Sequence, residues 1–236
     1  MAKFTSLAYK VIRESDLVLI VVDALKDDKS TYQHIIDVIE REGKPYIIVY
    51  NKADLLSKKM TPGPNEAYVS STKRLGTLVL LRKIMRHATK EITVGVVGLP
   101  NTGKSSLINA LKGRNAARTS PISGFTKSLQ KVRISQKVML LDSPGVFDSR
   151  LSYSKKVKAS VIDADSIKDP EAAVYKLMEE LDGMIERYYE VTKSDDYEDT
   201  LERIAIKKNV VSKGNIPDTQ RMAREIIRLW QRGKIR

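Results

Sequence analysis

The chain has 236 residues, 42% of them hydrophobic and 30% charged, a composition typical of a soluble globular protein of one or two domains. It contains no cysteine, which excludes disulfides, Cys-ligated zinc and a thiol nucleophile. Its two histidines, His34 and His87, lie in helical patterns and argue against a histidine triad. The apolar run 17–22 is far shorter than the about 20 residues of a membrane span, and it lacks the basic leader and small-residue cleavage site of a secretory signal. We therefore expect a cytoplasmic protein with no membrane contact.

Charge is unevenly distributed along the chain, whose net charge is +13. Residues 1–150 carry 25 basic and 13 acidic side chains, residues 163–202 carry 4 and 14, and residues 203–236 carry 10 and 2. A basic body and a basic tail on either side of an acidic stretch favour a polyanionic partner. A surface rich in Lys and Glu, as in thermophilic proteins, would give a similar balance.

Short apolar runs alternate with amphipathic stretches over the first 142 residues, which predicts an α/β domain with a mostly parallel sheet flanked by helices. Helices are expected at 4–14, 31–41, 76–89 and 104–112, and strands at 17–22, 46–50, 67–69, 92–97, 129–134 and 138–141. Segments 58–64 and 115–124 are rich in turn residues and are predicted to be loops.

After about residue 150 only helical patterns remain. One runs through apolar positions 174, 177, 178, 181, 185 and 188, a second through 201, 204 and 205, and a third begins after a capping Asp218 and stops at Gly233. At about 100° per residue, one sector of the third helix holds four basic residues: Arg221, Arg224, Arg228 and Arg232. The opposite sector is mostly apolar and holds Met222, Ala223, Ile226, Leu229 and Trp230. We therefore expect two domains, residues 1–150 and a small all-α domain over residues 151–236. The arginines are the candidate RNA-binding surface, although a solvated helix face would show the same spacing.

The residues from Gly98 to Ser105 read G-L-P-N-T-G-K-S and fit the pattern of a phosphate-binding loop between a strand and a helix. Backbone N–H groups of such a loop converge on phosphate oxygens, and the residues expected around the nucleotide are Asn101, Thr102, Gly103, Lys104, Ser105 and Ser106. Lys104 would contact the β- and γ-phosphates, and the Ser105 hydroxyl would bind Mg²⁺.

Asn51-Lys52-Ala53-Asp54 follows the predicted strand 46–50 and indicates which base is bound. The Asp54 carboxylate can accept hydrogen bonds from N1–H and the 2-amino group of guanine, whereas adenine offers neither donor. A cap or turn role for Asp54 is the structural alternative. Ser70, Ser71 and Thr72 follow another short strand and are expected to add contacts to the same base.

Two further positions are expected to sense the γ-phosphate. Asp142 begins D-S-P-G after a strand and suits a Mg²⁺-holding role, with the Gly145 N–H directed to the γ-phosphate. Thr126, in the segment after the phosphate loop and its helix, would close over Mg²⁺ as a switch. Lys104, Thr126 and Gly145 are thus the candidate catalytic residues, and Ser105, Thr126 and Asp142 the Mg²⁺ ligands.

The order of these motifs is unusual, because N-K-x-D and the serine loop precede the phosphate loop, whereas in Ras-like chains they follow it. In this the chain resembles the circularly permuted GTPases that act in large-subunit ribosome assembly. Val21-Val22-Asp23-Ala24 is similar to a short acidic motif of that group, and the C-terminal helices resemble its helical domain more loosely. The motifs predict GTP or GDP with Mg²⁺, the resemblance implies in addition a K⁺ ion held by Asn101, and we expect a monomer. The resemblance also implies the large ribosomal subunit or its precursor and rRNA as partners, and no DNA.

Ras-type enzymes place a glutamine directly after D-x-x-G, and this chain has Val146 there. An apolar residue cannot orient water, so we expect slow hydrolysis alone and stimulation by K⁺ and by a ribosomal particle. The alternatives are a P-loop ATPase, an RNA-binding scaffold that uses GTP without turnover, and a GTPase of the small subunit or tRNA. Two interpretations of the helical domain remain open. It changes position with the bound nucleotide, or it is joined to the first domain by a flexible linker and moves independently of the nucleotide.

Overall fold

The computed structural model describes residues 3–26, 28–113, 130–142, 156–157, 159–160 and 162–235. Its chain forms two compact units, Met1–Leu151 and Ser152–Arg236. In the described residues, no helix is long and apolar enough to cross a membrane.

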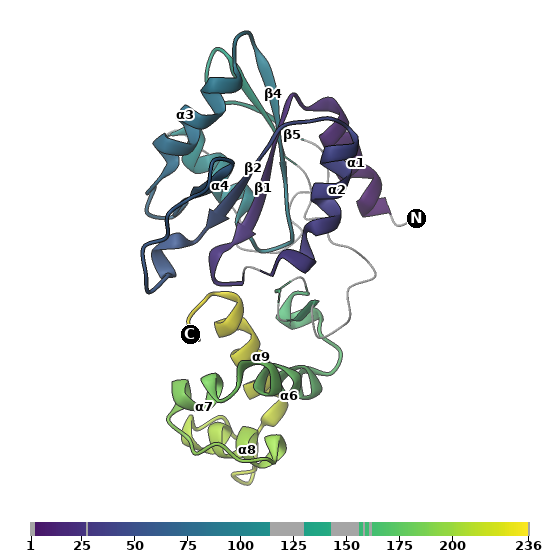
Figure 1. The fold of residues 1–236 in the computed structure, drawn as a ribbon. Coiled ribbons are helices and arrows are strands. Elements are labelled where there is room, and N and C mark those ends of the chain that lie inside the picture. The colour runs from purple at the N-terminus through teal and green to yellow at the C-terminus, as the bar shows by residue number, and fades with distance from the viewer. Residues whose placement is uncertain are drawn as a thin grey trace. The chain divides into compact units, whose positions relative to one another are not determined.

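The first unit is an α/β fold built on one six-stranded sheet (Figure 1). Its strands are β1 (Leu17–Asp23), β2 (Tyr46–Asn51), β3 (Glu66–Tyr68), β4 (Ile92–Val97), β5 (Gln130–Arg133) and β6 (Val138–Asp142). Their order is β3-β2-β1-β4-β6-β5, and only the β5–β6 pair is antiparallel. The predicted fold class, a mostly parallel sheet flanked by helices, is confirmed, and no strand boundary differs from the expected one by more than one residue.

Helices cover both faces of the sheet. They are α1 (Lys3–Glu14), α2 (Gln33–Arg41), α3 (Thr77–His87) and α4 (Lys104–Lys112), with the 3₁₀ turns η1 (Ala24–Lys26), η2 (Lys29–Thr31) and η3 (Ala53–Leu55) between them. One buried cluster joins α3 and α4 to the sheet, and the other joins α1 and α2 to its opposite face. Strand β1 is therefore buried along its whole length, which explains its unbroken apolar sequence.

The strand order places a topological switch point between β1 and β4. From β1 the chain moves outward to β2 and β3, and then returns to β4 on the other side of β1. Open α/β sheets bind ligands in the crevice at such a point, beyond the carboxyl ends of the strands. Because β1, β2, β4 and β6 are mutually parallel, the segments that follow them begin at this one edge.

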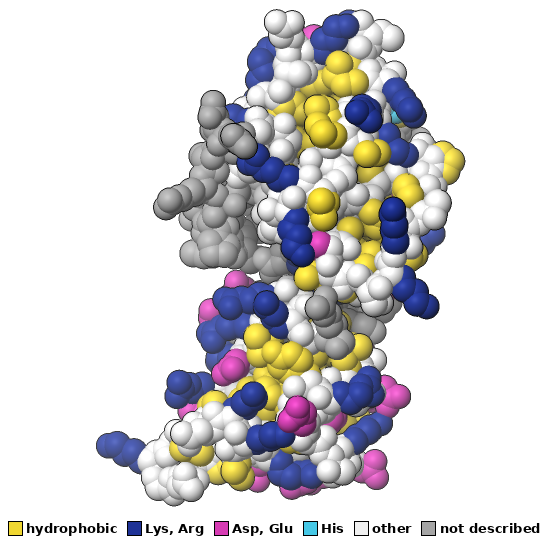
Figure 2. Space-filling view, turned by 90° about the vertical axis from the view of Figure 1, so that its left-hand side faces the viewer, with side chains coloured by type: hydrophobic (Ala, Val, Ile, Leu, Met, Phe, Trp, Pro, Cys, Tyr) yellow, Lys and Arg dark blue, Asp and Glu magenta, His cyan; other side chains and the backbone are white. Residues whose placement is uncertain are grey.

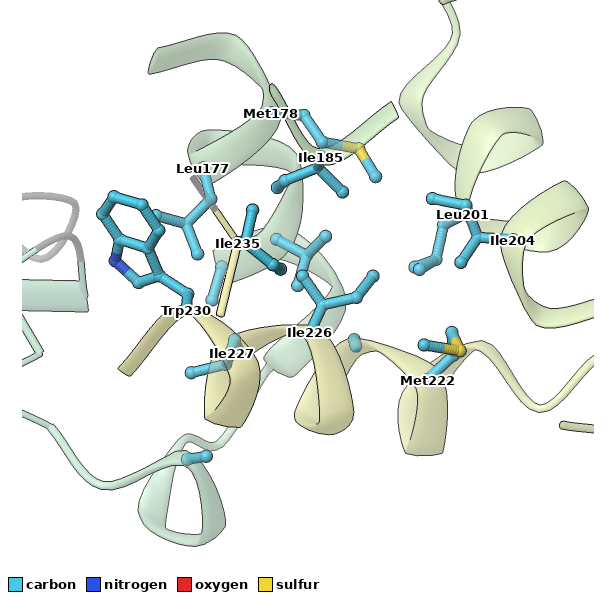
Figure 3. Packing of buried hydrophobic residues seen from close by; sticks show 14 of the residues in the cluster. Leu177, Met178, Ile185, Leu201, Ile204, Met222, Ile226, Ile227, Trp230 and Ile235 are labelled. Atoms are coloured by element: carbon cyan, nitrogen blue, oxygen red, sulfur yellow. The ribbon is translucent and has the colours of Figure 1, made fainter. Parts of the chain in front are cut away.

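The second unit is a small helical domain. It comprises η4 (Ala164–Ser166), α6 (Pro170–Leu181), α7 (Met184–Tyr189), α8 (Tyr197–Lys207) and α9 (Thr219–Gln231). Figure 3 shows its core, in which Met222, Ile226 and Trp230 of α9 pack with residues of α6, α7 and α8: Leu177, Met178, Ile185, Leu201 and Ile204. The expected cap of α9 is present, because the Asp218 side chain accepts from the Arg221 N–H.

The helical pattern through residues 174–188 is interrupted, so it forms two helices. Asp182 (φ 42°) and Gly183 (φ 77°) both adopt left-handed backbone, which ends α6 and starts α7 in a new direction. The break shifts the buried register, so that Tyr189 is 2% exposed and Tyr188, expected in the apolar pattern, is 41% exposed. Periodicity carried across the break therefore assigns the wrong tyrosine to the core.

Candidate functional site

The loop between β4 and α4 requires glycine at its first and last positions. A Cβ on Gly98 (φ +149°) would lie 2.3 Å from the Val21 carbonyl oxygen, and one on Gly103 (φ +89°) would lie 2.3 Å from Asn51 Nδ2. Any other residue would therefore displace the β1 backbone at Gly98, and the Asn51 side chain at Gly103. The loop is thus packed tightly against β1 and the end of β2, and the start of α4 directs backbone N–H groups toward it.

Lys104, the first residue of α4, lies back against the loop backbone. Its Nζ donates to the carbonyl oxygens of Gly98 (3.1 Å) and Leu99 (2.8 Å), and the side chain is buried. The Thr102 hydroxyl donates to the same Leu99 oxygen at 2.9 Å. Burial lowers the pKa of Lys104 to about 8, although the Asp142 carboxylate opposes that shift.

The Ser105 hydroxyl lies beside the carboxylate at the end of β6. Ser105 Oγ is 3.5 Å from Asp142 Oδ2, and Asp142 is 5% exposed. A hydroxyl and a carboxylate oxygen are ligands that Mg²⁺ accepts. The donor set fits this ion, and the structure brings together two predicted ligands that are 37 positions apart in sequence.

Asn51, at the end of β2, joins three loops through one buried amide. Its Nδ2 donates to the Thr102 carbonyl at 2.9 Å, and its Oδ1 accepts from the backbone N–H of Ser71 at 3.1 Å and from the Ser71 hydroxyl at 2.7 Å. Asn51 is 2% exposed. The phosphate loop, the N-K-x-D segment and the serine loop are therefore locked in one arrangement.

Lys52 adopts left-handed backbone (φ 62°), and its ammonium group is fixed from β1. Lys52 Nζ donates to Asp23 Oδ2 at 2.6 Å, while Asp23 Oδ1 accepts from the Leu25 N–H. Lys26 lies 3.9 Å from the same Oδ2, and burial lowers its pKa to about 7 against the pull of Asp23. Asp23 entered the sequence analysis only within a short acidic motif, and Lys26 was missed. A carboxylate that ends an otherwise apolar strand was the available signal.

Asp54 lies in η3, where its carboxylate is held by the serine loop. Lys73 Nζ lies 3.2 Å from Asp54 Oδ2. Burial acts to raise the pKa of Asp54, but hydrogen bonds from Ser70 and Lys73 outweigh it and bring the pKa below its ordinary value. Ser70 Oγ also lies 3.3 Å from Thr72 Oγ1. An ionised carboxylate is the form that accepts two N–H donors, as guanine presents.

The remaining predicted site residues are placed as follows. Asn101 has left-handed backbone (φ 62°) within the phosphate loop, and Ser106 is half-buried in the first turn of α4. Thr126 and Gly145 lie outside the described residues.

The four arginines of α9 do not share one environment. Arg224 donates to the carbonyls of Ala164 (3.0 Å) and Ile167 (3.1 Å), and Arg228 pairs with Asp165. Both therefore hold the segment around η4 to α9. Arg221 and Arg232 are exposed.

Comparisons with known proteins agree with this geometry. A family profile described as "50S ribosome-binding GTPase" matches residues 93–211. An uncharacterised GTP-binding protein of Methanocaldococcus jannaschii is 34% identical over 96% of this chain and 64% of its own length. Nucleolar GTP-binding protein 2 of Saccharomyces cerevisiae is 31% identical over 96% of this chain and 51% of its own. The chain thus spans between half and two-thirds of these two relatives.

A solved structure with the same fold is GNP-bound YlqF from T. maritima. It matches with a TM-score of 0.69 and 23% identity, over 99% of this chain and 95% of that one. The GDP-bound form of the same protein matches with a TM-score of 0.66 and 23% identity, over 95% of this chain and 93% of that one.

Proposed function

The chain belongs to the family of 50S ribosome-binding GTPases, and on that premise we propose that it binds GTP, hydrolyses it to GDP and phosphate, and acts as a nucleotide-dependent switch in assembly of the large ribosomal subunit. The observation that carries the proposal is the buried Asn51 amide, which holds the base-reading and phosphate-binding segments together. A site with both halves fixed suits one ligand that has a base at one end and phosphates at the other.

The phosphate half of the site would use residues of the loop, α4 and β6. The backbone N–H groups of residues 101–106 would bind the phosphates, with the Lys104 ammonium on the β- and γ-phosphates. Ser105 Oγ and the Asp142 carboxylate would hold Mg²⁺, which supplies charge neutralisation when bound. Thr126 and Gly145 would complete the γ-phosphate contacts, and they remain predictions from the motif order.

The base half would select guanine through Asp54, with Lys52 along the base and the loop of Ser70, Ser71 and Thr72 at its edge. The test is competition for labelled GDP: GTP should displace it and ATP should not. In Asp54→Asn, one carboxylate oxygen is replaced by an amide NH₂ donor. This donor would face the 2-amino group of guanine, so the affinity for guanine nucleotides should fall. Xanthine has an oxygen in place of that amino group, so the affinity for xanthine nucleotides should rise. Equal displacement by ATP would instead support an ATPase.

Hydrolysis is proposed to be slow in isolation because Val146 occupies the position of a water-orienting glutamine. The resemblance to circularly permuted GTPases supports a K⁺ ion held by Asn101, which would add positive charge near the transferred phosphate. Turnover should therefore rise when K⁺ replaces Na⁺ and again when a large-subunit precursor is added. Absence of turnover under every one of these conditions would favour a scaffold that uses GTP as a structural ligand.

The proposed partners are rRNA and the large subunit or its precursor, bound by a monomer in the cytoplasm. Of the four predicted arginines, Arg221, Arg228 and Arg232 are exposed, and Arg228 is paired with Asp165, so Arg221 and Arg232 are the ones proposed to contact phosphates. Arg221→Glu/Arg232→Glu should weaken rRNA binding and leave GTP affinity unchanged. Sedimentation with ribosomal subunits in GDP or a non-hydrolysable GTP analogue tests the switch.

A further inference from the structure

Helix α3 presents an outward face of mixed apolar and basic side chains. Its inner side buries Leu80 and Ile84, while three apolar residues of the outer side are open to solvent: Leu78 is 69% exposed, Val79 51% and Met85 38%. Leu75, just before the helix, is 58% exposed. Figure 2 looks onto this side of the molecule and shows hydrophobic side chains interspersed with Lys and Arg over the first unit.

The chain segment that contains α3 carries charge of one sign. Residues 67–90 contain six Lys or Arg and no Asp or Glu. Among the described residues, no ion pair or hydrogen bond involves the side chains of Arg82, Arg86 or Lys90, and all three are exposed. The acids that flank the stretch are engaged, because Glu66 accepts from Tyr50 and the Gly63 N–H, and Glu91 pairs with Arg133 at 2.7 Å.

We propose that the α3 face, defined as Leu75, Leu78, Val79, Arg82, Met85 and Arg86, is an RNA-docking surface. The inference rests on the proposed function and adds a second contact to that of the α9 arginines. Arg82 and Arg86 bind phosphates, since a guanidinium matches phosphate geometry with two parallel hydrogen bonds. The apolar side chains of the same face lie against riboses in the wide, shallow minor groove of an RNA helix.

Two observations favour RNA over an acidic protein as the occupant. The first is charge complementarity, because the 25 basic and 13 acidic residues of the first 150 positions set the unpaired arginines in a broadly positive unit. The second is shape, since an amphipathic protein segment is bound in a groove, whereas these side chains stand on the convex outer surface of one helix. A shallow RNA groove can accept a convex surface.

The face also adjoins the nucleotide site through the chain itself. Ser70, Ser71 and Thr72 lie a few residues before α3, and β4 and the phosphate loop follow it. In addition, Arg74 donates to the Gly113 carbonyl at the end of α4. RNA docked on α3 would thus contact the element that connects the two halves of the site.

The experiment uses the full chain with Arg82→Glu/Arg86→Glu and a control of equal charge change, Lys29→Glu/Arg41→Glu, which alters exposed residues at η2 and α2. Affinity for a large-subunit rRNA fragment is measured by fluorescence anisotropy over a salt series. We expect the α3 variant to bind at least tenfold more weakly, with a log–log salt slope shallower by about 2. In the control variant, the affinity for rRNA and the salt slope should both change by much less. Leu78→Gln should weaken binding several-fold with an unchanged slope.

The GTP affinity of every variant is measured as a check on folding and should match the original chain. If the original chain binds rRNA and the α3 variant binds like the control, the α3 inference is wrong and the proposed function stands. If the α3 variant loses binding to the ribosomal particle but not to naked rRNA, the occupant is a protein and the inference is again overturned. If the original chain binds neither rRNA nor particle, the proposed function itself is refuted.

Discussion

Replacing Asn51 by alanine removes the amide that connects three loops, and its cost can be worked out from the contacts. Asn51 makes three buried hydrogen bonds of 2.7, 2.9 and 3.1 Å. A hydrogen bond contributes about 1 kcal/mol net, so their loss costs about 3 kcal/mol of unfolding free energy. The partners at Thr102 and Ser71 then lack their buried donor or acceptor, which prevents compensation.

For a unit of about 150 residues, this loss corresponds to a fall in melting temperature of roughly 6–12 °C. Far-UV circular dichroism contains signal from the helices of both units, and the part of its transition that belongs to the first unit, which holds the whole described sheet, should move to lower temperature. The single tryptophan, Trp230, lies in the second unit, and its fluorescence transition should stay unchanged. GTP affinity, measured by titration with a fluorescent analogue, should fall at least tenfold because the loops no longer share one arrangement.

The matched control is Asn65→Ala, in which an exposed asparagine of the same unit is truncated. Its melting temperature should shift by no more than 1–2 °C, as expected for about 0.5 kcal/mol at a surface site. Equal melting temperatures and equal GTP affinities for Asn51→Ala and Asn65→Ala would refute the view that this amide organises the site.

Three further predictions concern neighbouring groups. Bound phosphates should raise the pKa of Lys104 above about 8, so GTP binding at pH 8.5 should be accompanied by proton uptake. The affinity for GTP should fall as the pH rises further. Calorimetry in buffers of different ionisation enthalpy measures the proton uptake. Asp23→Asn removes the 2.6 Å charged partner of Lys52 and should weaken GTP binding about tenfold in filter assays. Gly98→Ala would place a Cβ 2.3 Å from a backbone oxygen and should cost at least about 2 kcal/mol in urea unfolding.

Each of these has its own contrary result. Proton uptake near zero at pH 8.5 would mean that phosphates do not contact the Lys104 ammonium. An unchanged affinity of Asp23→Asn for GTP would show that the ion pair between Asp23 and Lys52 does not contribute to nucleotide binding. Gly43→Ala is the control for Gly98→Ala, because Gly43 also has positive φ (+62°) but nothing lies within 4 Å of its Cβ position. Equal losses in the two glycine variants would assign the cost to backbone strain alone.

The fold was predictable from sequence where a pattern was local. The strand 92–97 and the helix 104–112 match β4 and α4 residue for residue, since an apolar run, a glycine-rich loop and a capping geometry mark their ends. The break at Asp182 and Gly183 was not predicted, because the apolar spacing continues across it, although the Asp-Gly pair is itself a turn signal. Because the apolar spacing was carried across this break, Tyr188 was wrongly assigned to the core.

For the site, the motifs could be identified from the sequence, but the way they are held could not. The contact of Asn51 with Thr102 joins residues 51 positions apart, and Asp23 meets Lys52 across 29, so neither follows from local spacing. On α9, helical spacing put four arginines in one sector. It did not predict that Arg224 and Arg228 would bond to the segment around η4, because that partner is determined by tertiary packing.

The link between Asn51 and the phosphate loop has a consequence for biosynthesis. The residues proposed to bind the base precede residue 98 in the chain, so the Asn51 amide is synthesised before its acceptor at Thr102, 51 positions later. At roughly 5–20 residues per second, those 51 positions take about 3–10 seconds to emerge, and folding is vectorial over that interval. Under the proposed function, guanine nucleotide should consequently associate with stalled chains only after the residues of α4 have emerged from the exit tunnel.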